Sequence, residues 1–179
     1  EVDLTDMPSH QIARRGLVRT FQNLRLFGAL TVRENVEVSA LVASSTRRHR
    51  LPPDVDGLLL AAGLWEVRDR RARELDYGTS RRLELARAVA MAPSFLLLDE
   101  PTSGMSDAES LAMVDQVRRM AGVVGAGVVV IDHDLNFITG ICDRITCLDR
   151  GQVIAVGSAA EVQADPVVRA AYLGSSAET

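Results

Sequence analysis

The chain has 179 residues, of which 47% are hydrophobic and 25% charged, and a net charge of -4. This length suits one good core and is short for two domains, and the composition is ordinary for a globular protein. The negative charge argues against a general nucleic-acid binder, which normally carries a basic face. The longest run of low polarity, residues 121–131, is short for a membrane span, and nothing resembles a signal peptide, so we expect a cytosolic location.

The first elements predict a short helix and a strand. Pro8 near the start and Gly16 just past the end are typical of a helix, and an apolar and aromatic stretch then leads to Gln22. The simplest interpretation of Gln22 alone is a surface residue at a strand end. A capping box at residues 31–34 predicts a helix to about Ser44.

The region up to residue 74 is helical by pattern. A basic run at residues 46–50 predicts a solvated tip, with contact to lipid head groups or an acidic partner as the alternative. A helix over residues 55–62 is closed by Gly63, Trp65 is expected to fill the core or an interface, and residues 67–74 form a charged helix or turn.

Residues 75–107 organise the chain. Gly78 opens a basic helix that we place at residues 81–91, and residues 95–98 form an unbroken apolar run that ends at Asp99 and Glu100. Such a run suits a strand buried on both faces of a parallel sheet, and Pro101 stops it. Both carboxylates would then emerge at the carboxyl edge of the sheet, where α/β folds bind ligands. Taken alone, the pair could equally be an ordinary solvated strand end.

The remaining elements continue the α/β alternation. A capping box at residues 106–109 predicts a helix to about residue 121, with Leu111, Val114 and Val117 inward. A second buried strand over residues 127–132 leads to His133, which could also be a structural hydrogen-bonding residue. A helix (135–142), a hairpin (144–156), a third capping box (158–161) and a last helix (167–173) follow. Cys142 and Cys147 are expected to be reduced core residues.

Five motifs in order carry a family resemblance. They are the Q-loop glutamine at Gln22, the signature at residues 75–80, Walker B at residues 95–100, the D-loop at residues 104–107 and the switch histidine at His133. The chain thereby resembles the nucleotide-binding subunit of ATP-binding cassette (ABC) transporters. The resemblance implies an α/β, P-loop NTPase-like core with a mostly parallel sheet and a small helical subdomain. It implies a core remnant (1–22), the helical subdomain (23–78), the ATPase core (79–157) and C-terminal helices with a tail (158–179).

The resemblance also implies an ATPase site with ATP and Mg²⁺. Glu100 would be the base that orients the attacking water, and His133 would hydrogen-bond the γ-phosphate. Asp99 and Gln22 would serve the magnesium ion. The expected nucleotide contacts of the chain are Gln22, Tyr77, Gly78, Thr79 and Asp107. In the family, the signature turn completes the site of a second subunit, so a head-to-tail dimer of homologous ATPase subunits is implied.

Three departures from the family pattern matter. Asp76 stands where a serine is common, and would bring negative charge toward a phosphate unless it caps the helix instead. Ser80 shortens another polar contact. The motif G-x-x-x-x-G-K-[ST] is absent, so the phosphate-binding Walker A loop is missing. We therefore expect an amino-terminally truncated cassette that does not bind ATP tightly by itself.

The carboxyl end of the chain indicates the kind of transporter. Residues 165–167 and 171–174 resemble the end of branched-chain amino acid importer ATPases, and urea importers are similar there. This predicts an energy-coupling subunit at the cytoplasmic face of the membrane, partnered by permease subunits and indirectly by a solute-binding protein. The alternative is a truncated, non-catalytic cassette fragment that only binds a partner. ABC-type ATPases acting on DNA fit poorly, because only 53 positions separate Gln22 from Leu75 and leave no room for a long coiled coil. Ribosome-acting members also fit poorly, because they usually carry two cassettes in one chain.

Overall fold

The computed structural model describes residues 3–20, 24–45 and 53–175. Its elements, in chain order, are α1 (Ser9–Arg14), β1 (Leu17–Arg19), α2 (Val32–Ser45), α3 (Val55–Ala61), η1 (Trp65–Val67), η2 (Ala72–Glu74), α4 (Tyr77–Ala90), β2 (Phe95–Asp99), α5 (Asp107–Val124), β3 (Gly127–Ile131), α6 (Leu135–Ile141), β4 (Ile145–Asp149), β5 (Gln152–Gly157), α7 (Ala159–Ala164) and α8 (Pro166–Ser175). They form two compact units, Glu1–Asp132 and His133–Thr179. No helix in the described ranges has the length and apolar character needed to cross a bilayer.

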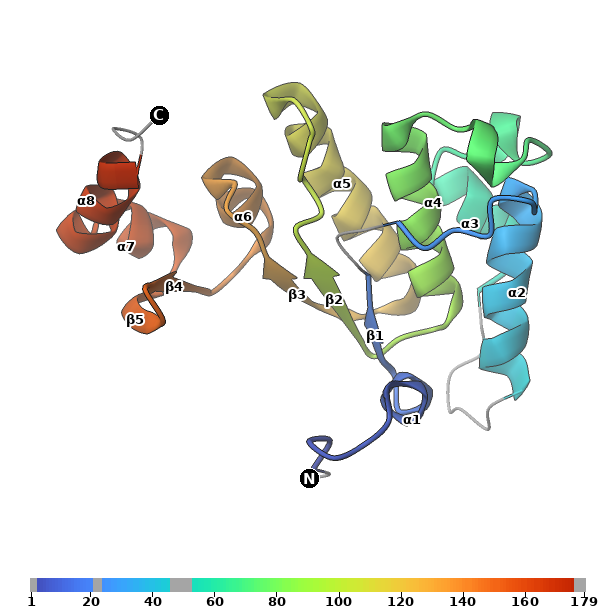
Figure 1. The fold of residues 1–179 in the computed structure, drawn as a ribbon, viewed down its shortest axis with the longest axis horizontal. Helices are drawn as coiled ribbons and strands as arrows, with labels where there is room; N and C mark the ends of the chain where they lie inside the picture. Colours follow the sequence, from blue (N-terminus) through green and yellow to red (C-terminus); the bar gives the residue numbers. More distant parts are fainter. Residues whose placement is uncertain (1–2, 21–23, 46–52, 176–179) are drawn as a thin grey trace. The chain divides into compact units, whose positions relative to one another are not determined.

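A three-stranded parallel sheet is the centre of the first unit (Figure 1), with strand order β1-β2-β3. Val18 of β1 pairs with Leu96 of β2, and Leu96 pairs with Val128 of β3. Parallel strands need long crossovers, and here α2 to α4 connect β1 to β2 while α5 connects β2 to β3. The predicted α/β class with a parallel sheet is confirmed, and β2 ends at Asp99, just before Pro101.

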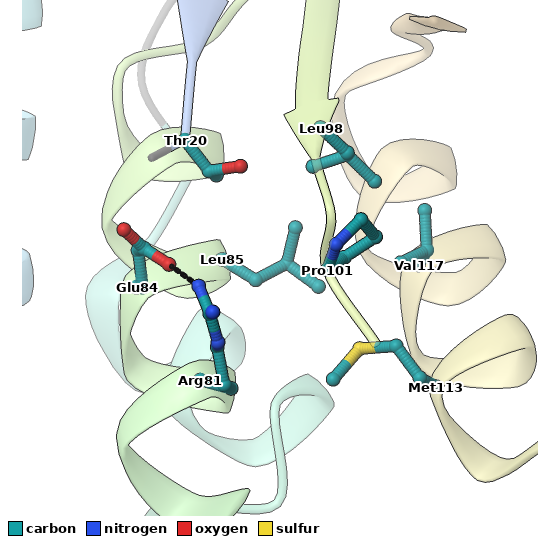
Figure 2. Close-up of a pocket in the computed structure, with 8 residues that line it drawn as sticks. All are labelled: Thr20, Arg81, Glu84, Leu85, Leu98, Pro101, Met113 and Val117. Atoms are coloured by element: carbon teal, nitrogen blue, oxygen red, sulfur yellow. Dashed lines mark hydrogen bonds and ion pairs between the residues drawn. The ribbon is translucent and has the colours of Figure 1, made fainter. Parts of the chain in front are cut away.

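Within the described residues of the first unit, one face of this sheet is more deeply buried than the other. Leu96 and Leu98 of β2 are buried, whereas Phe95 is 54% exposed and Ile131 of β3 is 67% exposed. Figure 2 shows that Leu98 lies with Leu85 of α4 and with Met113 and Val117 of α5 around a small cavity. The predicted burial of both strands on both faces is therefore wrong for the described structure, because only alternate residues of β2 are buried and no residue of β3 is fully buried.

The helical region follows the predicted pattern. The capping box at the start of α2 is present, since Thr31 N donates to Glu34 Oε2 at 2.7 Å and Glu34 N donates to Thr31 Oγ1 at 3.1 Å. The larger buried apolar residues of this region are Val32, Val36, Leu58, Leu59 and Leu64, and Leu83 of α4 is buried as well. Residues 67–74, predicted as a helix or turn, contain a short 3₁₀ turn at Ala72–Glu74, and a second 3₁₀ turn lies at Trp65–Val67. The predicted basic tip at residues 46–50 lies outside the described residues.

Two helix boundaries differ from prediction. Helix α4 begins at Tyr77, four residues before the predicted start, because the side chain of Asp76 caps it. Helix α5 runs through Gly122 to Val124 and ends at Gly125, whose φ of 59° allows the left-handed C-cap. Its apolar stripe contains Val114, Val117 and Met120 as buried residues, but the prediction that Leu111 points inward is wrong, since Leu111 is 56% exposed.

The second unit pairs a hairpin with short helices. Strands β4 and β5 are antiparallel, and Arg150 and Gly151 both have positive φ, as a tight two-residue hairpin turn requires. The capping box at Ser158 opens α7 as predicted, and α8 begins at Pro166, one residue before the predicted start. The buried apolar residues are Phe137, Ile138, Ile145, Val162 and Val168. Cys142 and Cys147 are unbridged but only half-buried.

Candidate functional site

The backbone turns sharply where β2 ends. Glu100 has a φ of 45°, in the left-handed region that non-glycine residues rarely adopt. Two hydrogen bonds hold it there: Glu100 N donates to Ile131 O at 2.8 Å, and Ser103 N donates to Glu100 O at 3.2 Å. Strain of this kind persists only where the surroundings impose it, and it concentrates at functional sites. Because of this turn, Glu100 no longer follows the alternation of side chains along β2. The usual rule that adjacent side chains of a strand point to opposite faces of the sheet therefore does not apply to Asp99 and Glu100.

The loop after Glu100 is fixed to the end of β3. Thr102 donates from Oγ1 to Asp132 Oδ2 at 2.7 Å and from its amide to the same oxygen at 3.2 Å. Pro101 and Thr102 are both buried. Sequence reasoning missed this pair, although both residues follow neighbouring parallel strands, whose carboxyl ends must lie close together.

Asp99 forms an ion pair in this structure. Arg19 Nη2 lies 2.6 Å from Asp99 Oδ2, and the side chains are 56% and 26% exposed respectively. Their strands are neighbours, since Arg19 pairs with Leu97 in the register of β1 and β2. An exposed pair of this kind is worth only about 0–1 kcal/mol, so Arg19 can leave Asp99 at little cost.

The residues at this edge suit magnesium only in part. A carboxylate oxygen such as that of Asp99 is the ligand type that Mg²⁺ prefers, and Mg²⁺ in nucleotide sites takes few protein ligands besides waters and phosphates. Within the described ranges, no group of three or more His, Cys, Asp or Glu side chains is arranged to hold a metal ion. Asp99 therefore fits as one ligand of an ion that nucleotide oxygens would complete.

The start of α4 shows how the unusual Asp76 is accommodated. Its carboxylate accepts hydrogen bonds from Thr79 N at 2.8 Å and Thr79 Oγ1 at 2.9 Å. These bonds hold the pKa of Asp76 below its ordinary value. The expectation that Asp76 caps the helix is confirmed, and its charge is turned onto the helix amides. A Cβ on Gly78 would meet only Asp76 Oδ1, at an ordinary 3.6 Å, so packing alone does not require glycine here.

The other predicted site residues fall in different places. Gln22 lies outside the described residues. Asp107 is exposed and is the first residue of α5. His133 is exposed and is the first residue of the second unit, with which it is described. The structure thus brings together Asp99 and Glu100 at one strand end, and joins Tyr77 to their loop, because Tyr77 Oη donates to Ser103 O at 2.8 Å.

Paired carboxylates at the carboxyl edge of a parallel sheet lie where α/β folds bind ligands, and a strained turn at the second is typical of a functional site. Comparison with protein families makes this specific. Residues 1–103 match the ABC transporter family model, and residues 152–178 match the model described as branched-chain amino acid ATP-binding cassette transporter. The chain belongs to the ATP-binding subunits of ABC transporters, and by family it is a nucleotide-binding ATPase.

Curated relatives agree with this assignment. The chain is 35% identical to the high-affinity branched-chain amino acid transport ATP-binding protein LivG of Salmonella typhimurium, over 97% of this chain and 74% of that protein. It is 33% identical to BraF of Pseudomonas aeruginosa, named for the same transport, over 96% of this chain and 73% of BraF. The lipopolysaccharide export system ATP-binding protein LptB of Acidithiobacillus ferridurans is 36% identical, over 96% of this chain and 70% of LptB.

A solved structure confirms the fold. The ADP conformation of MJ1267, an ATP-binding cassette of an ABC transporter, superimposes with a TM-score of 0.77 at 25% identity and covers 97% of this chain and 74% of its own. The predicted fold class, an ABC ATPase core, is therefore confirmed, whereas the fourfold division of the chain stays a prediction.

Proposed function

We propose that this chain is the energy-coupling part of an importer of branched-chain amino acids or a similar small solute, acting at the cytoplasmic face of the membrane. The observation that carries the proposal is the match of residues 152–178 to the branched-chain amino acid cassette model. Overall identity does not separate the candidates, because LivG and LptB are 35% and 36% identical to this chain. The family assignment gives no support to a non-catalytic binding fragment.

The proposed chemistry uses the edge of the first sheet. Glu100 orients the water that attacks the γ-phosphate or accepts its proton. The hydrogen-bonded turn fixes the backbone from which this carboxylate projects. Asp99 would offer a carboxylate oxygen to a magnesium ion, provided that Arg19 leaves the ion pair that it forms with Asp99 here. When bound, the ion draws charge from the phosphates. Gln22 is proposed to serve the same ion or water.

The remaining roles concern the phosphates and the second subunit. His133 is proposed to hydrogen-bond the γ-phosphate, and Asp107 to contact nucleotide across the dimer. The turn at Tyr77, Gly78 and Thr79 is proposed to face the nucleotide of the partner through the backbone of Tyr77 and Gly78, because the amide of Thr79 already donates to the Asp76 carboxylate. We propose a head-to-tail dimer of homologous ATPase subunits, docked on permease subunits that receive solute from a binding protein.

A chimera tests the function. The amino-terminal segment of E. coli LivG, joined before Glu1, would be expressed in a strain that lacks LivG. We expect uptake of branched-chain amino acids and hydrolysis of ATP, both lost in the Glu100→Gln chimera and kept in Asp115→Asn, which removes an exposed charge from α5. Complementation of a strain lacking LptB instead would favour lipopolysaccharide export, the second candidate. A chimera that folds and hydrolyses no ATP would refute the proposal.

A further inference from the structure

We propose that Tyr77 and Arg81 are positioning residues that tie the start of α4 to the loop carrying Glu100. We call this set of hydrogen bonds, from Arg81 through Tyr77 to Ser103, the tie. The tie is seen in this chain by itself, and its role in ATP hydrolysis rests on the proposed function. It would join the predicted phosphate-facing turn to the predicted base within one subunit.

The tie begins at the phenol of Tyr77. Its Oη donates to Ser103 O at 2.8 Å, across 26 positions of sequence. The ring also lies against the turn of the loop, because a Cβ on Gly104 would meet Tyr77 Cε1 at 3.9 Å. Tyr77 is 44% exposed, so burial alone does not hold the ring in this orientation.

Arg81 fixes the direction of the hydrogen bonds. Arg81 Nε and Nη2 lie 3.0 and 2.8 Å from Tyr77 Oη. A guanidinium has only donors, so the phenol oxygen must accept from Arg81, and its single hydrogen is left for the carbonyl of Ser103. Arg81 is anchored in turn by Glu84, whose Oε2 lies 3.1 Å from Nη1. Figure 2 shows this pair facing the cavity below the end of β2.

The anchor is stiff because it is buried. Arg81 and Glu84 are only 4% and 8% exposed, and the cavity beside them measures about 20 Å³ and is otherwise lined mainly by apolar side chains. A buried ion pair is costly to break, so the guanidinium has little freedom to leave the phenol. The phenol of Tyr77 is therefore fixed by Arg81 of α4 while it donates a hydrogen bond to the loop that follows Glu100.

The tie reaches Glu100 through Ser103. Ser103 O accepts from Tyr77, and the amide of the same residue donates to Glu100 O at 3.2 Å. Met105 N donates to Thr102 O at 3.0 Å, which completes the loop. Holding Ser103 thus supports the turn that keeps Glu100 in its left-handed conformation.

Amide hydrogen exchange of the 179-residue chain, followed by NMR without nucleotide, tests the tie. Tyr77→Phe removes one hydroxyl and keeps the ring. One lost hydrogen bond corresponds to about a fivefold change, so we expect the amides of Ser103 and Met105 to exchange about fivefold faster. The amides of Met113 and Val117 in α5 should change less than about twofold, because a local opening leaves the core intact. The Glu100 amide resonance should also shift.

Thr79→Val is the matched control. It removes another hydroxyl from the first turn of α4, one that bonds Asp76 and Arg82 and makes no recorded bond to the loop. Loop exchange should stay at the native rate in this variant. Arg81→Lys, which cannot bond the phenol with two nitrogens, should accelerate loop exchange as Tyr77→Phe does. Unchanged loop exchange in Tyr77→Phe, or a uniform rise across α5 as well, would overturn the proposal. Because no nucleotide is present, these outcomes are independent of the chimera's activity.

Discussion

The left-handed conformation of Glu100 predicts that glycine at this position stabilises the fold relative to alanine. Both substitutions remove the side chain, so their difference isolates the backbone conformation with its φ of 45°. A left-handed conformation costs a non-glycine residue about 1–2 kcal/mol. The extra chain entropy of glycine in the unfolded state offsets about 0.5–1 kcal/mol. We therefore expect Glu100→Gly to be more stable than Glu100→Ala by about 0.5–1 kcal/mol.

Urea unfolding followed by tryptophan fluorescence measures this difference. Trp65 is the only tryptophan and belongs to the first unit, so its signal reports the unit that contains Glu100. Ser103 supplies the control, because it lies in the same loop without a positive φ. There the order should reverse, with Ser103→Gly less stable than Ser103→Ala by about 0.5–1 kcal/mol. The same order at both positions would refute the claim that Glu100 stores backbone strain.

Three further predictions concern packing, charge and thiols. Leu96→Ala should cost about 2–5 kcal/mol in urea unfolding and Leu111→Ala less than about 0.5 kcal/mol, because only the first is buried. Asp76→Ala should cost about 1 kcal/mol at neutral pH as a lost helix cap. Because the pKa of Asp76 is lowered in the folded chain, its carboxylate stabilises the fold at any pH above the ordinary value of 3.8. This stabilisation is lost as the pH falls through the pKa of the folded state. Melting scans should therefore show that Asp76→Ala destabilises the chain less in acid than at neutral pH. Burial raises the pKa of the Cys142 and Cys147 thiols, so iodoacetamide should label both more slowly in the native chain than in urea, and equal rates would contradict this.

Local signals in the sequence predicted much of the site's framework. Asp99 ends a strand because the apolar run stops there and Pro101 cannot continue it. The capping boxes at Thr31, Ser106 and Ser158 marked helix starts correctly, since each depends on side chains only three residues apart. These features are encoded within a few residues, so they can be inferred without tertiary contacts.

Features set by distant contacts could not be predicted in the same way. The bond between Tyr77 and Ser103 joins segments 26 positions apart, and the bonds between Thr102 and Asp132 span 30. The motif pattern predicts a nucleotide contact for Tyr77, but it carries no information about which carbonyl the hydroxyl meets. The conformation of Glu100 is likewise imposed from outside, by the carbonyl of Ile131 on the neighbouring strand.

The error over strand burial shows a more general limit. A continuous apolar run reports that no residue of the strand favours water, which is a property of the side chains and not of their surroundings. In β2 the side chains of Leu96 and Leu98 are buried, while Phe95 on the other face remains 54% exposed. Phe95 also lies so close to β3 that a Cβ on Gly127 would come within 2.9 Å of its ring. The apolar pattern therefore locates the strand and its end correctly, and the number of covered faces depends on elements that no single strand's sequence specifies.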